Sequence, residues 1–408
     1  MTVAARSPEA APRHVLPVLV AAQFAGTSLW FAVNAVMPDL QRELGWPAAA
    51  VGTLTSALQL GFIAGTLVFA LLAIADRFSP RKVFLLCSLA GAACTVGAWW
   101  MVREYNALLL WRVATGFFLA GIYPVGMKIA AQWFPQGLGA ALGLLLGALV
   151  LGSASAHALR GINSLGGLSS LGEGGALLPW PSVMLGVAGL AAAGGLLLYR
   201  LLPEAPAGPA RTSRLEWRAL GAVWTDWRVR ASVLGYFGHM WELYSMWVLV
   251  PLILSTRLDG ATLSFAAFAV VGAGSLGCVV GGRLAQRWGS ARVAMVQLGT
   301  SGLCCLAAPW LIGAPGFWFA AWLLLWGITV SGDSPQLSAL TASNAPRQAV
   351  GSVLTLTNSM GFAISIVSIE LFTTLARQHA LGTLLPWLGL GPALGLLALR
   401  PLLNPLPR

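Results

Sequence analysis

The stretch RVATGFFLAGIYPVGMKIAAQWFP, residues 112–135, decides the fold of this chain. It is apolar enough to lie in a membrane, yet it has an arginine near one end, a lysine near the other and a Gly-xxxx-Gly-xx-Pro run between them. The same run returns roughly 210 residues later. The residues that align are Gly116, Gly121, Pro124 and Pro135 with Gly327, Gly332, Pro335 and Pro346.

A second echo lies at nearly the same offset. It pairs Ala75, Arg77, Lys82 and Val83 with Ala285, Arg287, Arg292 and Val293. Two independent echoes separated by about half of the chain argue for a duplicated unit. In an apolar chain, such a long-period duplication predicts a transporter made of two halves.

The composition places the chain in a membrane. Of the 408 residues, 57% are hydrophobic and 9% are charged, whereas about 25% are charged in ordinary soluble domains. So few charges cannot cover a soluble protein of this length, but lipid can replace water around it. The net charge of +11 reflects basic residues in short loops on one side, so we expect no nucleic-acid partner. The five cysteines lie in apolar runs and are interpreted as packing residues.

Twelve apolar runs, each close to the roughly 20 residues that cross a bilayer, follow one another along the chain. They are residues 15–37, 49–75, 83–102, 107–131, 139–159, 181–202, 231–255, 263–284, 293–312, 316–340, 350–375 and 381–399. The pattern predicts an all-α membrane protein with twelve transmembrane helices in two pseudo-symmetric six-helix bundles. We expect residues 1–202 to form the first bundle, 203–230 a cytoplasmic linker and 231–408 the second bundle.

The basic residues predict the orientation. With a cytoplasmic N-terminus, eighteen of the 24 Lys and Arg residues fall in inner segments and five in outer loops. This excess predicts a multi-pass protein of the cytoplasmic membrane with both termini in the cytoplasm. The linker begins with the helix-breaking run PEAPAGPA, after which Ser213–Trp224 is expected to form a short helix on the membrane surface.

The arrangement of six plus six spans, with a basic inner loop between the second and third, resembles the major facilitator superfamily. The loop AIADRFSPRKV, Ala73–Val83, looks like the family's cytoplasmic signature, although Leu72 and Ser79 stand where glycines are usual. The second-half copy, GGRLAQRWGSAR, has Gln286 in the acidic position. Arg112 with Gly116 is similar to the family's helix-four motif. The resemblance covers essentially the whole chain and implies alternating access by rocking of the two bundles.

The signature loops are interpreted as a conformational latch whose contacts break when the halves rock. Its expected members are Asp76, Arg77, Arg81, Lys82, Arg287 and Arg292. The acid could accept hydrogen bonds at a neighbouring helix end, while the basic residues pair with carboxylates or lipid phosphate. The alternative is that these charges only set the orientation in the membrane.

Substrate contacts are expected from polar and charged groups at membrane depth, which are costly unless they have a function. Arg112 could hold an anion in a guanidinium fork, and the family resemblance also implies proton transfer there. The alternative for Arg112 is a structural ion pair with Glu104. Neutral contacts to substrate are expected from Trp30, Asn34, Tyr123 and Asn358.

Proton coupling is expected from three further residues within the apolar runs. His239 and Glu242 are three positions apart and so share a helix face, where they could exchange a proton. Asp333 follows Gly332 and precedes Ser334-Pro335, where a loosened helix could expose an acid to a cavity. The alternatives are a Glu242–His239 pair that only fixes packing, and a hinge at Asp333.

These residues predict a secondary transporter of a small solute, preferably an anion, driven by protons. No Walker loop is present, so ATP is not the expected drive, and we expect no enzyme activity, cofactor or metal. The sequence loosely resembles nitrate and nitrite porters. A proton-driven drug or metabolite efflux antiporter is an alternative, although residues 139–159 lack the proline of the usual drug-antiporter signature. A membrane sensor is a further alternative, and a monomer is expected.

Overall fold

A computed structural model describes residues 11–47, 49–134, 138–162, 177–204, 218 and 221–403, and the regular structure of these residues is helical. The first half contains α1 (Val15–Thr27), α2 (Ala32–Leu44), α3 (Ala50–Leu71), α4 (Ile74–Arg77), α5 (Pro80–Trp100), α6 (Tyr105–Leu119), α7 (Tyr123–Trp133), α8 (Leu138–Gly161) and α9 (Trp180–Leu201). The second half contains α10 (Gly221–Thr225), α11 (Trp227–Leu254), α12 (Gly260–Gly272), α13 (Gly274–Trp288), α14 (Ser290–Leu311), α15 (Gly316–Gly332), α16 (Ser334–Asn344), α17 (Val350–Leu375), α18 (Leu381–Leu384), η3 (Leu385–Gly389), α19 (Leu390–Leu399) and η4 (Arg400–Leu403).

The described helices confirm a multi-pass membrane protein. Eleven of the segments in the described part are long and apolar enough to cross a bilayer, including the joined pairs α1–α2, α6–α7 and α12–α13. The remaining predicted span, residues 316–340, falls on α15 and α16, which are separated by Asp333. The expected surface helix at Ser213–Trp224 lies mostly outside the described residues; α10 covers only its end.

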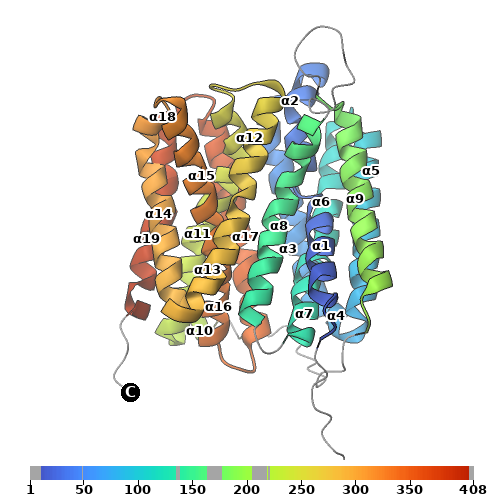
Figure 1. Ribbon diagram of the computed structural model, residues 1–408, viewed down its shortest axis with the longest axis vertical. Helices are drawn as coiled ribbons and strands as arrows, with labels where there is room; N and C mark the ends of the chain where they lie inside the picture. Colours follow the sequence, from blue (N-terminus) through green and yellow to red (C-terminus); the bar gives the residue numbers. More distant parts are fainter. Residues whose placement is uncertain are drawn as a thin grey trace, which may run out of the picture.

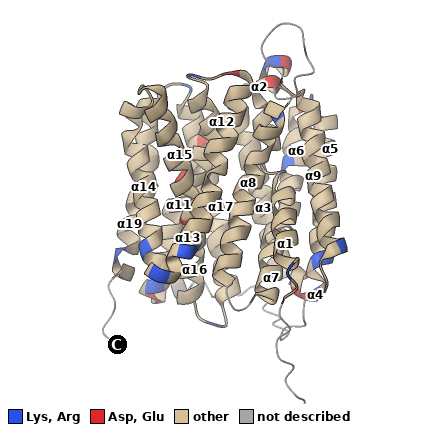
Figure 2. Ribbon diagram, viewed as in Figure 1, with Lys and Arg blue, Asp and Glu red and all other residues tan. Residues whose placement is uncertain are grey.

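The long helices stand side by side and run between two opposite faces (Figure 1). We call the face at which α1 begins and α19 ends the inner face, and the opposite face, where α2 ends, the outer face. Basic residues gather along the inner face in Figure 2, and few coloured segments lie in the middle of the bundle. This distribution is the one that the positive-inside rule requires if the inner face is cytoplasmic.

The duplicated glycine and proline run produces the same break in both halves. The fourth span is interrupted between Leu119 and Tyr123, and the corresponding span is interrupted at Asp333 before Ser334. In each case a proline follows at the second position of the new helix, where its missing N–H costs nothing. The repeat in the sequence therefore encodes a pair of broken helices.

Two glycines of the repeat allow backbones to touch. A Cβ atom built on Gly116 would lie 1.9 Å from the Leu58 carbonyl oxygen of α3. Its counterpart, Gly327, would place a Cβ atom 2.0 Å from the Val270 carbonyl oxygen of α12. Only glycine permits such an approach, so each broken helix is packed directly against a neighbour in its own half.

The two halves meet along two seams: α8 packs against α12 and α13, and α3 packs against α17. Close contacts mark the α3–α17 seam at several levels: Gly52 touches Thr373 towards the outer face, and Ser365 donates a hydrogen bond to Gln59 Oε1 at 2.8 Å. These seams frame the space in which the candidate site lies.

Candidate functional site

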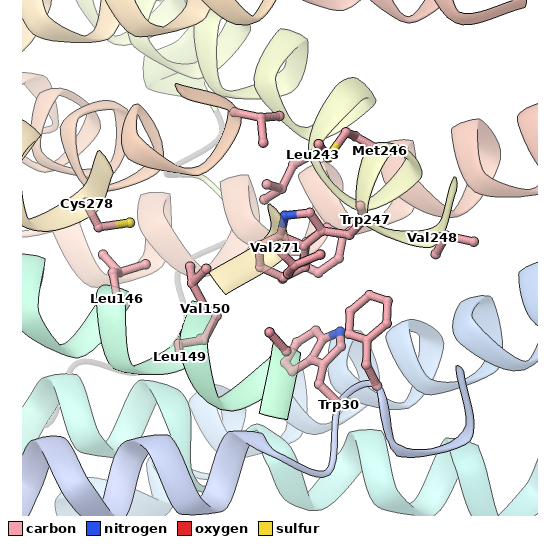
Figure 3. Packing of buried hydrophobic residues seen from close by; sticks show 14 of the residues in the cluster. Trp30, Leu146, Leu149, Val150, Leu243, Met246, Trp247, Val248, Val271 and Cys278 are labelled. Atoms are coloured by element: carbon pink, nitrogen blue, oxygen red, sulfur yellow. The ribbon is translucent and has the colours of Figure 1, made fainter. Parts of the chain in front are cut away.

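An aromatic layer closes the interface between the halves. Three of its six rings come from the first half (Trp30, Phe31 and Phe62) and three from the second (Tyr244, Trp247 and Phe362). Trp30 stacks on Tyr244 with 5.7 Å between ring centroids and 18° between planes, and Phe62 lies 4.7 Å from Phe362. Figure 3 shows Trp30 and Trp247 among apolar side chains of α8 and α11. The rings interlock across the line along which the halves must separate.

Cavities lie on both sides of the aromatic layer. On the outer side, a vestibule of about 650 Å³ is lined by Phe31 and Trp247. On the other side, a midplane cavity of about 30 Å³ is lined by Tyr244, Trp247 and Phe362. Because a cavity of that size holds little more than one water molecule, this conformation is closed around the midplane. A further cavity of about 290 Å³ opens towards the inner face between α3, α7 and α17.

The midplane cavity has apolar and hydroxyl-bearing walls. Tyr123 and Asn358, both predicted as substrate contacts, line it from opposite halves. Apolar side chains of α8 and α11 complete the wall, together with Tyr236 and two serines, Ser334 and Ser338, on α16. No Lys or Arg of the described chain lines this cavity.

His239 and Asp333 form a buried pair immediately beside the midplane cavity. The Nδ1 atom of His239 lies 2.9 Å from Oδ1 of Asp333, and both side chains are essentially fully buried. Nε2 of His239 and Oδ2 of Asp333 have no hydrogen-bond partner in the described part of the chain. Tyr236, whose ring centroid is 5.8 Å from that of His239, lines the cavity and so links the pair to it. The helix break therefore delivers an acid to a histidine on another helix.

Glu242 faces a different neighbourhood from His239. Its carboxylate accepts hydrogen bonds from Trp326 Nε1 (2.6 Å), Ser301 Oγ (2.9 Å) and Cys305 Sγ (3.1 Å). These donors lie on α14 and α15, so the acid is enclosed within the second half. The predicted pairing of Glu242 with His239 is absent among the described contacts, and the histidine pairs with Asp333 instead. The role of Glu242 in proton coupling remains a prediction.

Arg112 holds the break between α1 and α2. Its Nη2 donates to the Trp30 carbonyl oxygen at 2.8 Å, Nη1 to that of Leu29 at 3.4 Å, and Nε to that of Leu54 at 3.5 Å. The side chain is 1% exposed. Carbonyls at a helix end lack intrahelical donors, so this guanidinium satisfies groups that the break releases. The alternative partner, Glu104, makes no ion pair with Arg112 among the described residues, and the role of Arg112 in substrate binding remains a prediction.

Asn34 lies on the vestibule side of the aromatic layer. It donates through Nδ2 to Thr55 Oγ1 at 2.7 Å, whereas its Oδ1 has no partner among the described residues. Of the predicted neutral contacts, Trp30 is therefore in the aromatic layer, Asn34 is above it, and only Tyr123 and Asn358 line the midplane cavity.

The predicted latch residues divide into two groups. Asp76 pairs with Lys128 of α7, which also donates to the Ala75 carbonyl oxygen, next to the inner cavity. Arg81 donates from Nε to Glu204 Oε1 at 2.7 Å and from Nη1 to the Leu202 carbonyl oxygen at 2.9 Å. Both pairs lie within the first half, so they brace it in this conformation. The other group, Arg77, Lys82, Arg287 and Arg292, is exposed at the inner face.

Glu204 is held in its ionised form at the inner end of α9. Partial burial acts to raise the pKa of this carboxyl, but hydrogen bonds from Ser79 and Arg81 and the charges of Arg81 and Lys82 outweigh it and lower the pKa below its usual value. Sequence reasoning missed Glu204, although its position beside the breaker-rich linker, close to the basic signature loop, was a usable signal.

The aromatic partners in the second half were also missed. Tyr244, Trp247 and Phe362 belong to apolar runs in which aromatic residues are common, and nothing in the sequence distinguishes them from packing residues. Their placement against Trp30 and Phe31 follows from the way in which α11 and α17 lie against the first half.

Comparisons with known proteins agree with this architecture. A family model described as Major Facilitator Superfamily matches residues 19–369. The chain is 31% identical over 281 residues to a chloramphenicol resistance protein of Streptomyces lividans, an alignment that covers 68% of this chain and 67% of that protein. Similar solved structures include the human organic anion transporter MFSD10 (TM-score 0.70, 16% identity, 95% of this chain and 99% of that chain). Another is the E. coli proton:xylose symporter XylE (TM-score 0.73, 12% identity, 96% of each chain). At such low identities, the structural likeness shows the fold alone.

Proposed function

This chain belongs to the Major Facilitator Superfamily, and from that premise we propose that it is a proton-coupled efflux antiporter for small uncharged solutes with an aromatic or apolar body. The observation that carries the proposal is the midplane cavity, whose walls are apolar, aromatic and hydroxyl-bearing and which lies beside the His239–Asp333 pair. The relative with 31% identity is named for chloramphenicol resistance, which agrees with a solute of this kind and with outward transport.

The character of the walls favours an uncharged solute. An anion enclosed at the midplane would need a compensating cation, because an unpaired charge is expensive to remove from water. Arg112, which contacts the backbone of Trp30 in the aromatic layer, donates to three main-chain carbonyls instead. Tyrosine and serine hydroxyls and the Asn358 amide can orient the hydroxyl and amide groups of a neutral solute.

The His239–Asp333 pair supplies a reason for antiport. With an ionised acid and a neutral histidine the pair carries one negative charge, which is costly to enclose between the halves. A proton removes that charge. A solute whose hydroxyl or amide donates towards the acid through Tyr236 and Ser334 offsets part of the same cost. The halves can then close around either the proton or the solute, which exchanges one for the other.

The small anion preferred from the sequence remains a second candidate. The observation that favours it is the group of arginines in the outer vestibule, which would draw anions towards the interface between the halves. The outward direction of transport, its coupling to protons and the cytoplasmic position of the inner face are all parts of this proposal.

Transport into proteoliposomes tests the proposal. Chloramphenicol, which is uncharged and combines an aromatic ring with hydroxyl and amide groups, serves as the first solute, and nitrate and benzoate serve as anions. We expect chloramphenicol movement that follows an imposed pH gradient, with the gradient dependence lost in Asp333→Asn and in His239→Gln. Glu104→Gln is the matched control, because this acid is exposed at the start of α6. Gradient-driven movement of the anions alone, or an unaltered response in both pair variants, would refute the proposal.

A further inference from the structure

We propose that the outer vestibule is a second binding site, which takes an amphipathic carboxylate: an acid with one charged head and an aromatic or aliphatic body. The vestibule has a volume of about 650 Å³, within the range of sites that enclose a small organic molecule. It is separated from the midplane cavity by the aromatic layer, so it is distinct from the site proposed for transport.

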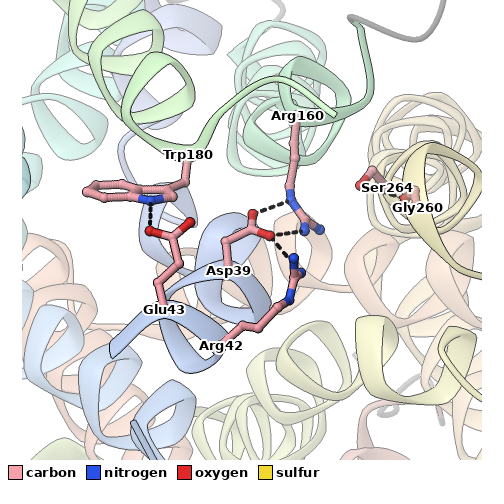
Figure 4. A network of polar contacts seen from close by, with 7 residues as sticks. All are labelled: Asp39, Arg42, Glu43, Arg160, Trp180, Gly260 and Ser264. Atoms are coloured by element: carbon pink, nitrogen blue, oxygen red, sulfur yellow. Dashed lines mark hydrogen bonds and ion pairs between the residues drawn. The ribbon is translucent and has the colours of Figure 1, made fainter. Parts of the chain in front are cut away.

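One wall of the vestibule is a built polar cluster (Figure 4). Arg160 of α8 grips Asp39 of α2 with two hydrogen bonds, Nε to Oδ2 and Nη2 to Oδ1, both of 3.0 Å. Arg42 donates to the same Oδ1 at 3.0 Å. Arg160 is 4% exposed, so the cluster is part of the packed structure rather than a solvated surface pair. Two guanidiniums thus share one carboxylate.

Among the residues that the structure describes, the charges of the vestibule leave a positive excess. Three arginines line it: Arg42, Arg160 and Arg377. The acids that offset their charge are Asp259, which also lines it, and Asp39, which is bound by Arg160. Glu43, the other acid near the cluster, is turned away and accepts from Trp180 Nε1 at 2.9 Å. A carboxylate is the group that restores neutrality and accepts from a guanidinium fork.

A buried amide gives the second, independent indication of a ligand. Asn34 is 7% exposed and lines the vestibule, and its Oδ1 has no hydrogen-bond partner among the described residues. Buried acceptors without donors are rare in proteins because they cost free energy. His157, 3% exposed, also lines the vestibule. This oxygen is itself buried, so a hydroxyl on the ligand body would donate to it only if the amide turns towards the vestibule.

The opposite wall is apolar and suits the body of the ligand. Phe31 and Trp247 form the floor, and Leu252 and Leu263 form the side. An amphipath bound here would lie directly on the aromatic layer and bridge the two halves, because both halves contribute basic and apolar side chains to the vestibule. Occupancy should therefore hold the outer side in one arrangement and slow transport through it.

Binding of 2-naphthoate to the purified full chain in detergent, measured by equilibrium dialysis, tests the site, with uncharged 2-naphthamide as comparator. We expect naphthoate to bind about tenfold more tightly, because charge-assisted hydrogen bonds are made only by the acid. Arg377→Gln should weaken naphthoate binding about threefold and leave naphthamide unchanged. Arg103→Gln, an exposed arginine outside the vestibule, should behave like the parent.

Arg160→Gln should cause a larger loss, and thermal unfolding of that variant checks its fold. Equal binding of acid and amide, or an Arg377→Gln protein that binds naphthoate like the parent, would overturn the inference. Loss of naphthoate binding in Asn358→Ala with no effect of Arg377→Gln would also overturn it, because the probe would then occupy the midplane cavity. These readouts use no transport measurement, so failure here is separate from failure of the proposed function.

Discussion

Replacing Arg112 with lysine should loosen the break in the first span. Arginine reaches three carbonyl oxygens on two chain segments, those of Leu29 and Trp30 at the break and that of Leu54 on α3. A lysine ammonium is a single point and lacks the planar fork that spans all three. In the most favourable case it keeps the 2.8 Å contact with Trp30 and abandons the other two.

The expected cost follows from those two contacts. They are long, 3.4 and 3.5 Å, so each contributes near the lower end for a buried hydrogen bond, about 1 kcal/mol. Arg112→Lys should therefore lower the free energy of unfolding by about 2 kcal/mol. Because Trp30 is part of the aromatic layer, the same change should make the layer open more often.

Two assays read these effects. Denaturant titration in detergent measures the free energy of unfolding, with the exposed Arg103→Lys as control. A cysteine at the midplane cavity, Ser334→Cys, reports opening through its rate of labelling by a membrane-impermeant thiol reagent added from the outer face. The five native cysteines are buried, which keeps the background low. A lysine variant with unchanged stability and unchanged labelling would refute the role of Arg112 in holding the break between α1 and α2. A change in substrate affinity alone would instead favour the substrate-binding role predicted from the sequence.

Three further outcomes are expected. Trp30→Ala should accelerate the same outer labelling about tenfold, because two aromatic pairs across the interface, each worth about 0.5–1.5 kcal/mol, are lost, whereas Trp30→Phe should change it little. Gly116→Ala should destabilise the protein by more than about 2 kcal/mol in a denaturant titration, since its Cβ would meet a backbone oxygen, while Gly189→Ala, with no atom within 4 Å of that Cβ, should not. The pKa of Glu204 is lower in the folded protein than its usual 4.5, so its pair with Arg81 stabilises the fold above pH 4.5, and this contribution is lost as the pH falls through the folded pKa. In Glu204→Gln, the melting temperature should therefore fall less steeply at acidic pH than in the parent. An equally steep fall in both proteins would count against the pair.

Much of the architecture could be predicted from composition and repetition. The bilayer demands continuous apolar segments whose backbone groups are satisfied internally, so the spans are visible in the sequence itself. The repeat placed Gly116 and Gly327 in equivalent positions, and the structure confirms that both meet a neighbouring backbone. The loosened helix at Asp333 was predicted from Gly332 and Pro335, and the structure shows a break there and at the corresponding place in the fourth span. The first span breaks between Thr27 and Ala32 with Gly26 before the break but no proline after it, and this break was not predicted.

The candidate site was predicted less well, because partners in a membrane protein are selected by helix packing. His239 and Glu242 differ by three positions, which leaves about 60° between them around the helix axis. That separation is small enough to suggest one shared face, yet large enough for His239 to reach Asp333 at the break before α16 and for Glu242 to reach α14 and α15. The sequence also did not show that Asp39 holds Arg160 across two helices.

The sequence by itself determined that this chain spans a membrane many times, that its halves are copies, and which few charges lie at depth. These properties depend on the solvent and on local backbone chemistry, and both act on each segment separately. Only the tertiary structure decided that Arg112 caps a broken helix, that His239 meets Asp333, and that six rings close the outer path. Those pairings depend on how helices rotate and lean against one another, and the close packing of all the side chains fixes that geometry together.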